Sequence, residues 1–257
     1  MLDRRAFVIA LSASLLAART SDADWWGRRL PSPPAQFIFG YGSLINSASR
    51  KATSAAPIPA IPARVSAAFG YVRAWNDRSP SGFTALGLRR PLAGEPPTTI
   101  NGVLYPVDGD DMSRFDVREV GYTRVEIPRE VIEAVSWQRL PEEGRIWVYV
   151  PARPGGVPGE GLPEPDAAYP MLQSYIDVVI EGALEYGPDY ARELIETTAG
   201  WSVYWLNDRE LARRPWVRDP KSAVVDRLLA ATAPASSRLP DRLLPEVFAV
   251  RWLAPAR

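Results

Sequence analysis

Phe37-Ile38-Phe39-Gly40-Tyr41-Gly42-Ser43-Leu44 sets the architecture that we predict for this chain. The first three residues are apolar and predict a short buried strand that ends in a tight turn at Gly40. Glycine permits a positive φ and a close approach of the backbone, so successive N–H groups here can point into one small concavity. Such a concavity binds a carboxylate or stabilises an oxyanion. The alternative is that the two glycines only form a turn.

A second chemically informative region lies further along the chain. Residues 100–107 predict a strand, and Asp108 is typical of the N-cap of a short helix that runs to about Glu119. A carboxylate at a helix C-terminus faces the negative end of the helix dipole, which raises its pKa. A raised pKa suits a general base and acid that works near neutrality. The alternative is a surface ion pair of Glu119 with Arg118 or Arg124.

The remaining pattern predicts one α+β domain. Further strands are expected at 64–75, 84–89, 122–127 and 145–150, and helices at 169–186, 188–198 and 221–231. The segments 55–62 and 151–170 are rich in Pro and are expected to be loops. Strands followed by late helices favour a mixed β-sheet, curled or barrel-like, with flanking helices.

We divide the chain into four parts. Residues 1–23 are a predicted signal segment, 24–35 a polar and Pro-rich approach, 36–200 the folded domain and 201–257 a C-terminal extension rich in Arg, Trp and Pro. The extension is expected to pack Trp205 and Trp216 on the domain. The alternative is a surface that binds carboxylates through its arginines.

Composition excludes several classes of function. The 257 residues contain no Cys and no His, which removes thiol nucleophiles, disulfides, Ser-His-Asp triads and the usual zinc, haem and iron–sulfur ligands. Thirty basic and thirty acidic side chains cancel, so nothing indicates nucleic acid or an anionic membrane as a partner. We expect no metal and no cofactor. Proton transfer in an enzyme of this composition rests on Asp, Glu, Tyr, Lys, water or backbone groups.

The N-terminus has the pattern of an export signal. Arg4 and Arg5 precede an apolar run from Ala6 to Ala18, which is too short to span a bilayer and is followed by small residues. The paired arginines are also compatible with twin-arginine export. We therefore predict a periplasmic protein with no membrane span after removal of the signal; a cytoplasmic location is the alternative.

Taken together, these motifs resemble the γ-glutamylcyclotransferase superfamily, which includes the ChaC-like enzymes. The resemblance rests on Gly40-Tyr41-Gly42-Ser43-Leu44, then Gly102-x-Leu104-Tyr105, then Asp116-x-x-Glu119-x-x-Tyr122-x-Arg124. It covers residues 36–127 well and extends loosely to a helix at 175–187.

The resemblance implies a compact α+β fold and an enzyme that converts a γ-glutamyl amide into 5-oxoproline and a free amine. By the same resemblance, Glu119 is the catalytic carboxylate. The substrate-binding residues would be Tyr41, Gly42, Ser43, Leu44 and, with a less defined role, Tyr122. The alternative is a non-catalytic binding module of the same fold. Glutathione, γ-glutamyl amino acids and γ-glutamylamines all stay open as substrates.

Overall fold

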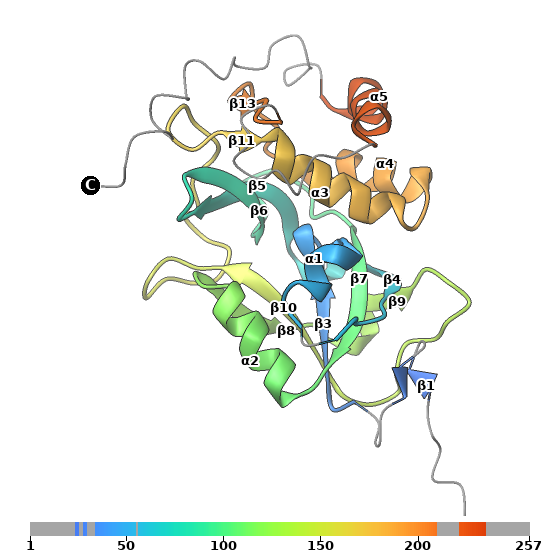
Figure 1. Cartoon of the computed structure of the whole chain (residues 1–257). Coiled ribbons are helices and arrows are strands. Elements are labelled where there is room, and N and C mark those ends of the chain that lie inside the picture. The colour runs from blue at the N-terminus through green and yellow to red at the C-terminus, as the bar shows by residue number, and fades with distance from the viewer. Residues whose placement is uncertain (1–23, 26–27, 30–33, 55, 210–220, 235–257) are drawn as a thin grey trace, which may run out of the picture.

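The computed structural model describes residues 24–25, 28–29, 34–54, 56–209 and 221–234 (Figure 1). Its strands are β1 Asp24–Trp25, β2 Arg28–Arg29, β3 Gln36–Gly40, β4 Ile61–Val65, β5 Val72–Ser79, β6 Phe83–Arg89, β7 Ile100–Val107, β8 Tyr122–Glu126, β9 Ile132–Ala134, β10 Arg145–Pro151, β11 Met171–Leu172, β12 Thr198–Ala199 and β13 Trp205–Leu206. Its helices are α1 Ser47–Lys51, α2 Gly109–Arg118, α3 Gln173–Leu184, α4 Pro188–Glu196 and α5 Ser222–Thr232, with 3₁₀ turns at Ser43–Ile45, Ala67–Phe69 and Arg129–Val131. The predicted signal segment, and Trp216 in the predicted extension, lie outside the described residues.

The main sheet has six strands in the order β8-β10-β3-β7-β4-β9. Strand β3 lies inside it, antiparallel to β7 and parallel to β10. Its residues Phe37, Ile38 and Phe39 are at most 2% exposed, which explains why this strand has no polar alternation. The described strand order has two ends, so this sheet is open. The sheet is mixed as predicted, but the prediction of a curled or barrel-like shape is wrong.

A second sheet, β12-β5-β6, is built around a long hairpin. The alternation at 64–75 predicted one continuous strand, and this prediction is wrong. Residues 61–65 belong to the main sheet, whereas Val72–Ser79 begins the second sheet. The chain turns between them through Ala67–Phe69 and Gly70, whose φ of 73° is in the left-handed region that favours glycine.

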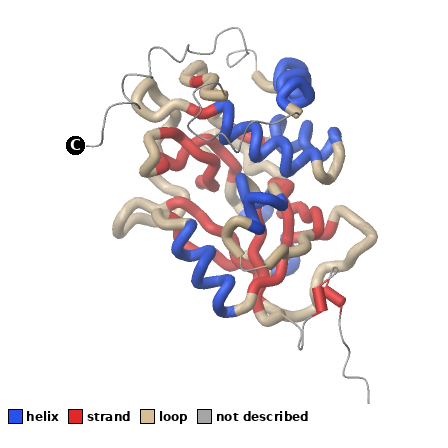
Figure 2. The backbone as a smooth tube through the Cα atoms, in the orientation of Figure 1, coloured by secondary structure: helices blue, strands red, loops and turns tan. Residues whose placement is uncertain are grey.

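The helices lie on the outside of the strands (Figure 2). Helices α3 and α4 lie side by side above β5 and β6, and α2 lies near β8 and β10 (Figure 1). The N-cap role predicted for Asp108 is confirmed, because its carboxylate accepts the N–H of Asp111 at 2.8 Å. The predicted loop between residues 151 and 171 contains no helix or strand in the structure.

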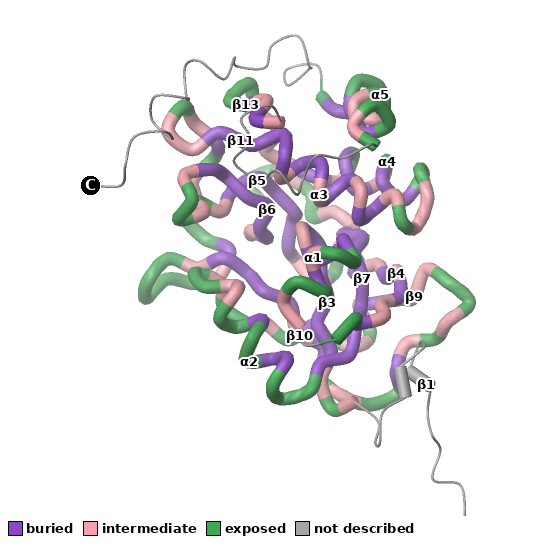
Figure 3. The backbone as a smooth tube through the Cα atoms, in the orientation of Figure 1, coloured by how far each residue is buried: buried purple, intermediate pink, exposed green. Residues whose placement is uncertain are grey.

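One large hydrophobic core joins the main sheet to the helices (Figure 3). Trp205 is 1% exposed, Val225 is fully buried and Leu229 is 1% exposed, and all three belong to this core. The described part of residues 201–257 thus packs on the same core as the sheet. The fold is therefore a mixed α+β arrangement. Among the described residues, no helix has the length and apolar character needed to cross a bilayer.

Candidate active site

The loop after β3 is tightly folded. A Cβ at Gly40 would lie 2.8 Å from the Cβ of Leu44, so only glycine lets the chain fold back here. The N–H of Ile45 donates to the carbonyl of Gly42 at 2.9 Å, and this bond opens a 3₁₀ turn. The N–H groups of Ser43 and Leu44 precede that first bond, so the turn itself does not use them. They are the donors that the sequence predicted for an anion.

Helix α3 packs directly on this loop. A Cβ at Gly182 would lie 2.4 Å from the backbone nitrogen of Asn46, so this glycine permits the contact. The contact brings Tyr175 to the loop, where its hydroxyl lies 3.3 Å from the position that a Cβ on Gly42 would take. Gly42 itself has a φ of −123°, so it is required for space and not for a positive φ. Of the two properties of glycine considered for this loop, close approach of the backbone is the one that the structure uses, since neither Gly40 nor Gly42 has a positive φ.

Glu119 lies across the cavity from the loop, at the C-cap of α2. Its N–H donates to the carbonyl of Phe115 at 2.9 Å, and its carbonyl accepts the N–H of Tyr122 at 3.0 Å. The side chain is 15% exposed, so the ion pair with Arg118, 3.2 Å from Nε to Oε1, is not the surface pair of the alternative interpretation. Burial raises the pKa of Glu119, and the charge of Asp77 raises it further, whereas Arg118 lowers it.

Arg118 ties the carboxylate to the loop. Its guanidinium donates to Ser43 Oγ at 3.0 Å and to Thr53 Oγ1 at 2.6 Å. It also donates to Ser49, at 2.8 Å to the carbonyl oxygen and at 2.9 Å to Oγ. One side chain therefore sets both the position of the loop and the electrostatics of Glu119.

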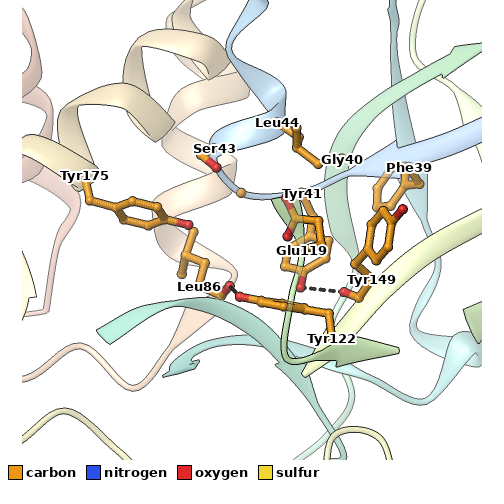
Figure 4. A pocket seen from close by; sticks show the side chains of 11 residues that line it. Phe39, Gly40, Tyr41, Ser43, Leu44, Leu86, Glu119, Tyr122, Tyr149 and Tyr175 are labelled. Atoms are coloured by element: carbon orange, nitrogen blue, oxygen red, sulfur yellow. Dashed lines mark hydrogen bonds between the residues drawn. The ribbon is translucent and has the colours of Figure 1, made fainter. Parts of the chain in front are cut away.

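Tyrosines form the walls of the site, and the hydroxyls of two of them are held by backbone carbonyls (Figure 4). Tyr41 donates to the carbonyl of Tyr149 at 2.7 Å, and Tyr122 donates to the carbonyl of Leu86 at 3.0 Å. Burial raises the pKa of Tyr41 and of Tyr122 well above the usual range, and raises that of Tyr175 to about 12. These phenols stay protonated near neutrality, so among the described residues that line the inner cavity Glu119 is the side chain that can exchange a proton.

Two connected cavities meet at Glu119. The inner one, of about 30 Å³, is lined by Phe39, Gly40, Tyr41, Gly42, Ser43, Leu44, Leu86, Glu119, Tyr122, Tyr149 and Tyr175. The outer one, of about 580 Å³, shares Ser43, Glu119, Tyr122 and Tyr175 with it. A ligand can thus place a single small group, such as an oxygen, in the inner cavity and the rest of its atoms in the outer one.

The structure brings all six residues predicted from the sequence to the inner cavity: Tyr41, Gly42, Ser43, Leu44, Glu119 and Tyr122. The sequence did not single out Tyr149, Tyr175 or Asp77, which line one or both cavities. Tyr175 belongs to the helix that the sequence predicted at 169–186. Nothing in the sequence pattern showed that Gly182 would bring this helix to the loop.

Behind the loop lies Arg73, which is fully buried. It donates to the backbone carbonyls of Tyr41, Asn101 and Leu194 at 3.5, 2.7 and 3.0 Å, and also to uncharged side-chain oxygens. Burial lowers its pKa to about 10, so the side chain is still charged at neutral pH. This charge adds to the positive potential of the loop. Among the described residues, no group of three or more acidic side chains could hold a metal ion.

No family model matches the chain, and no curated protein sequence matches it. Solved structures with a similar fold are found. An uncharacterised protein from Homo sapiens is 14% identical with a TM-score of 0.44, and the match covers 62% of this chain and 85% of that one. Gamma-glutamyl cyclotransferases are also among these structures.

A structure called gamma-glutamyl cyclotransferase is 14% identical, with a TM-score of 0.40 and the same coverage of 62% and 85%. A yeast gamma-glutamyl cyclotransferase specific to glutathione is 15% identical with a TM-score of 0.35, covering 78% of this chain and 97% of that one. Because these TM-scores are below 0.5, we infer the function from the residues of the cavity.

Proposed function

We propose that this chain is a γ-glutamylcyclotransferase-type enzyme that cyclises a γ-glutamyl amide to 5-oxoproline and releases the amine. The observation that carries the proposal is the position of Glu119. It is a mostly buried carboxylate with a raised pKa, and it lines the same small cavity as the loop at Ser43 and Leu44. A binding module would not need an ionisable group with a raised pKa at this position.

The loop binds the negative charge of the substrate. The N–H groups of Ser43 and Leu44 are aligned at the start of the 3₁₀ turn, and the buried guanidinium of Arg73 lies behind them. These donors would hold the substrate α-carboxylate or the oxyanion that develops on the γ-carbonyl. The inner cavity of about 30 Å³ admits only a terminal oxygen or a similarly small part of the γ-glutamyl group. Holding that end of the group beside Glu119 would supply part of the proximity that ring closure requires.

Glu119 moves the proton. The substrate α-ammonium has a pKa of roughly 8 and must lose a proton before its nitrogen can attack. Glu119 accepts that proton, the α-nitrogen forms a bond to the γ-carbonyl carbon, and the amide C–N bond breaks. The proton then passes from Glu119 to the leaving nitrogen. The ring nitrogen gives up its second proton to Glu119 or to water, which leaves the neutral amide N–H of 5-oxoproline and lets the amine depart as an ammonium once it takes up that proton. The raised pKa of Glu119 lies closer to the pKa of the α-ammonium, and this smaller difference favours the first proton transfer.

The test is an assay of the product. We expect the purified protein to release 5-oxoproline from at least one γ-glutamyl amide, detected by mass spectrometry. The same amide with an acetylated α-amine should not react, because its nitrogen cannot attack. Release of glutamate in place of 5-oxoproline would indicate a hydrolase, and binding of the amide without any product would indicate a binding module.

A further inference from the structure

The outer cavity is where the released amine must lie, if the proposed function is right. The inner cavity of about 30 Å³ has room only for a terminal oxygen or a similarly small part of the γ-glutamyl group, and Glu119 lies on the wall that both cavities share. The group beyond the scissile bond therefore extends into the outer cavity of about 580 Å³. The side chains of that cavity decide which amines fit.

One face of the β5–β6 hairpin forms part of this cavity. Asp77 and Ser79 of β5 and Phe83 and Ala85 of β6 line it. The pairing of β5 with β6 shifts by one residue at Asn76, which has no partner in the register. The pairing resumes at Asp77, which lies opposite Ala85. Asp77 is therefore placed by regular sheet pairing and not by a loop, and the position of its carboxylate is well defined.

Charge in the outer cavity is unbalanced. Its charged lining residues are Asp77, Arg118, Glu119 and Glu181. Among the described residues of this lining, Arg118 is the only cation, and it is engaged with Ser43, Ser49, Thr53 and Glu119. Burial raises the pKa of Asp77 to about 6, and the Tyr122 hydroxyl lowers it, so Asp77 is largely ionised at neutral pH. Glu181 on α3 has an oxygen, Oε1, that is buried without a hydrogen-bond partner within the described structure.

We propose that Asp77 is a specificity-determining residue that selects γ-glutamyl amides whose released amine carries a second positive charge. This inference rests on the proposed function and narrows its substrate to γ-glutamylamines of the diamine type. A carboxylate on the leaving amine, as in a γ-glutamyl amino acid, would meet the charges of Asp77 and Glu181 and is disfavoured. A distal ammonium is attracted by the same charges.

The experiment compares three γ-glutamyl amides of equal chain length with the full chain. Their distal groups are an ammonium, a methyl and a carboxylate, and kcat/KM is measured by release of 5-oxoproline. We expect the ammonium compound to exceed the carboxylate compound by about a hundredfold, since each single step in charge is worth about tenfold at this site. Raising the salt concentration should reduce the preference.

Variants of Asp77 test whether this residue causes the preference for the ammonium compound. Asp77→Asn should reduce the preference for the ammonium compound by about tenfold, and Asp77→Glu, which keeps the charge, should retain most of it. Asp110→Asn removes an exposed carboxylate at the first turn of α2, outside both cavities, and should change nothing. If Asp77→Asn does not fold, the test is made on the wild type alone. The ranking of the three compounds by kcat/KM, and the change of that ranking with salt, then decide whether the cavity prefers a positive charge.

The outcomes separate the two claims. Turnover with no charge preference, or with a preference for the carboxylate compound, would overturn the role of Asp77 while the proposed function stands. An unchanged preference in a folded Asp77→Asn protein would overturn it as well. If none of the three compounds, and no other γ-glutamyl amide, yields 5-oxoproline, the proposed function fails and the inference with it.

Discussion

Replacing Arg118 by Met removes the link between the loop and the carboxylate. Methionine keeps an unbranched apolar stem but loses the donors to Ser43, Ser49 and Thr53 and the ion pair with Glu119. Hydrogen bonds from a charged donor contribute about 1.5–3 kcal/mol each when buried. Arg118 is 25% exposed and the freed hydroxyls can reach water, so we expect a total loss of about 3 kcal/mol in the free energy of unfolding.

Two assays measure the effect. Thermal unfolding should show a midpoint lower by roughly 6–12 °C for a chain of this size. The pH profile of kcat/KM should also move. Arg118 lowers the pKa of Glu119, so its removal raises that pKa and shifts the acidic limb of the profile to higher pH.

Arg118→Lys is the matched control. It keeps the charge but not the fork of donors, so it should retain the position of the acidic limb while losing part of the stability. An Arg118→Met protein with wild-type stability and a wild-type pH profile would refute the view that this side chain positions the loop and tunes Glu119.

Three further predictions follow from the same geometry. Gly42→Val places a Cβ 3.3 Å from the Tyr175 hydroxyl and adds methyl groups at the wall of the inner cavity, so turnover of the folded variant should fall at least tenfold. Gly109→Val, in open space, is its control, and equal activity in the two variants would mean that the loop is only a turn. Asp77→Asn removes a charge that raises the pKa of Glu119, so the acidic limb of kcat/KM should shift to lower pH; a shift upward would contradict this assignment. For export, we propose that the mature chain begins between Arg19 and Asp24, which intact mass in a periplasmic fraction would show; a chain that retains Met1 in the cytoplasm would contradict it.

The sequence correctly predicted the parts of the fold that have strong local signals. Three consecutive apolar residues before Gly40 indicated a buried strand, and Asp108 indicated a helix start because its side chain caps the backbone locally. The false strand at 64–75 also came from a local signal, since alternation continued through a turn whose only mark is Gly70. Periodicity does not report which sheet a strand joins.

The residues of the candidate site also fall into those that a local motif predicts and those that it does not. The loop and Glu119 are short motifs that could be found in the sequence, and their meeting at one cavity is as expected. Asp77 could not be found, because its role depends on the pairing of β5 with β6 and on a cavity formed by α3. The raised pKa of Glu119 was predicted from the helix dipole, whereas the structure shows burial as its largest cause.

The most direct test of the central claim is the turnover of Glu119→Gln. Glutamine has nearly the same size and can still pair with Arg118, but it cannot accept the proton of the α-ammonium. With a γ-glutamyl amide that the wild type cyclises, we predict that kcat falls by roughly 10²–10⁴ while the dissociation constant and the unfolding midpoint stay close to those of the wild type. A correctly folded Glu119→Gln protein that forms 5-oxoproline at a rate near that of the wild type would contradict the assignment of Glu119 as the base.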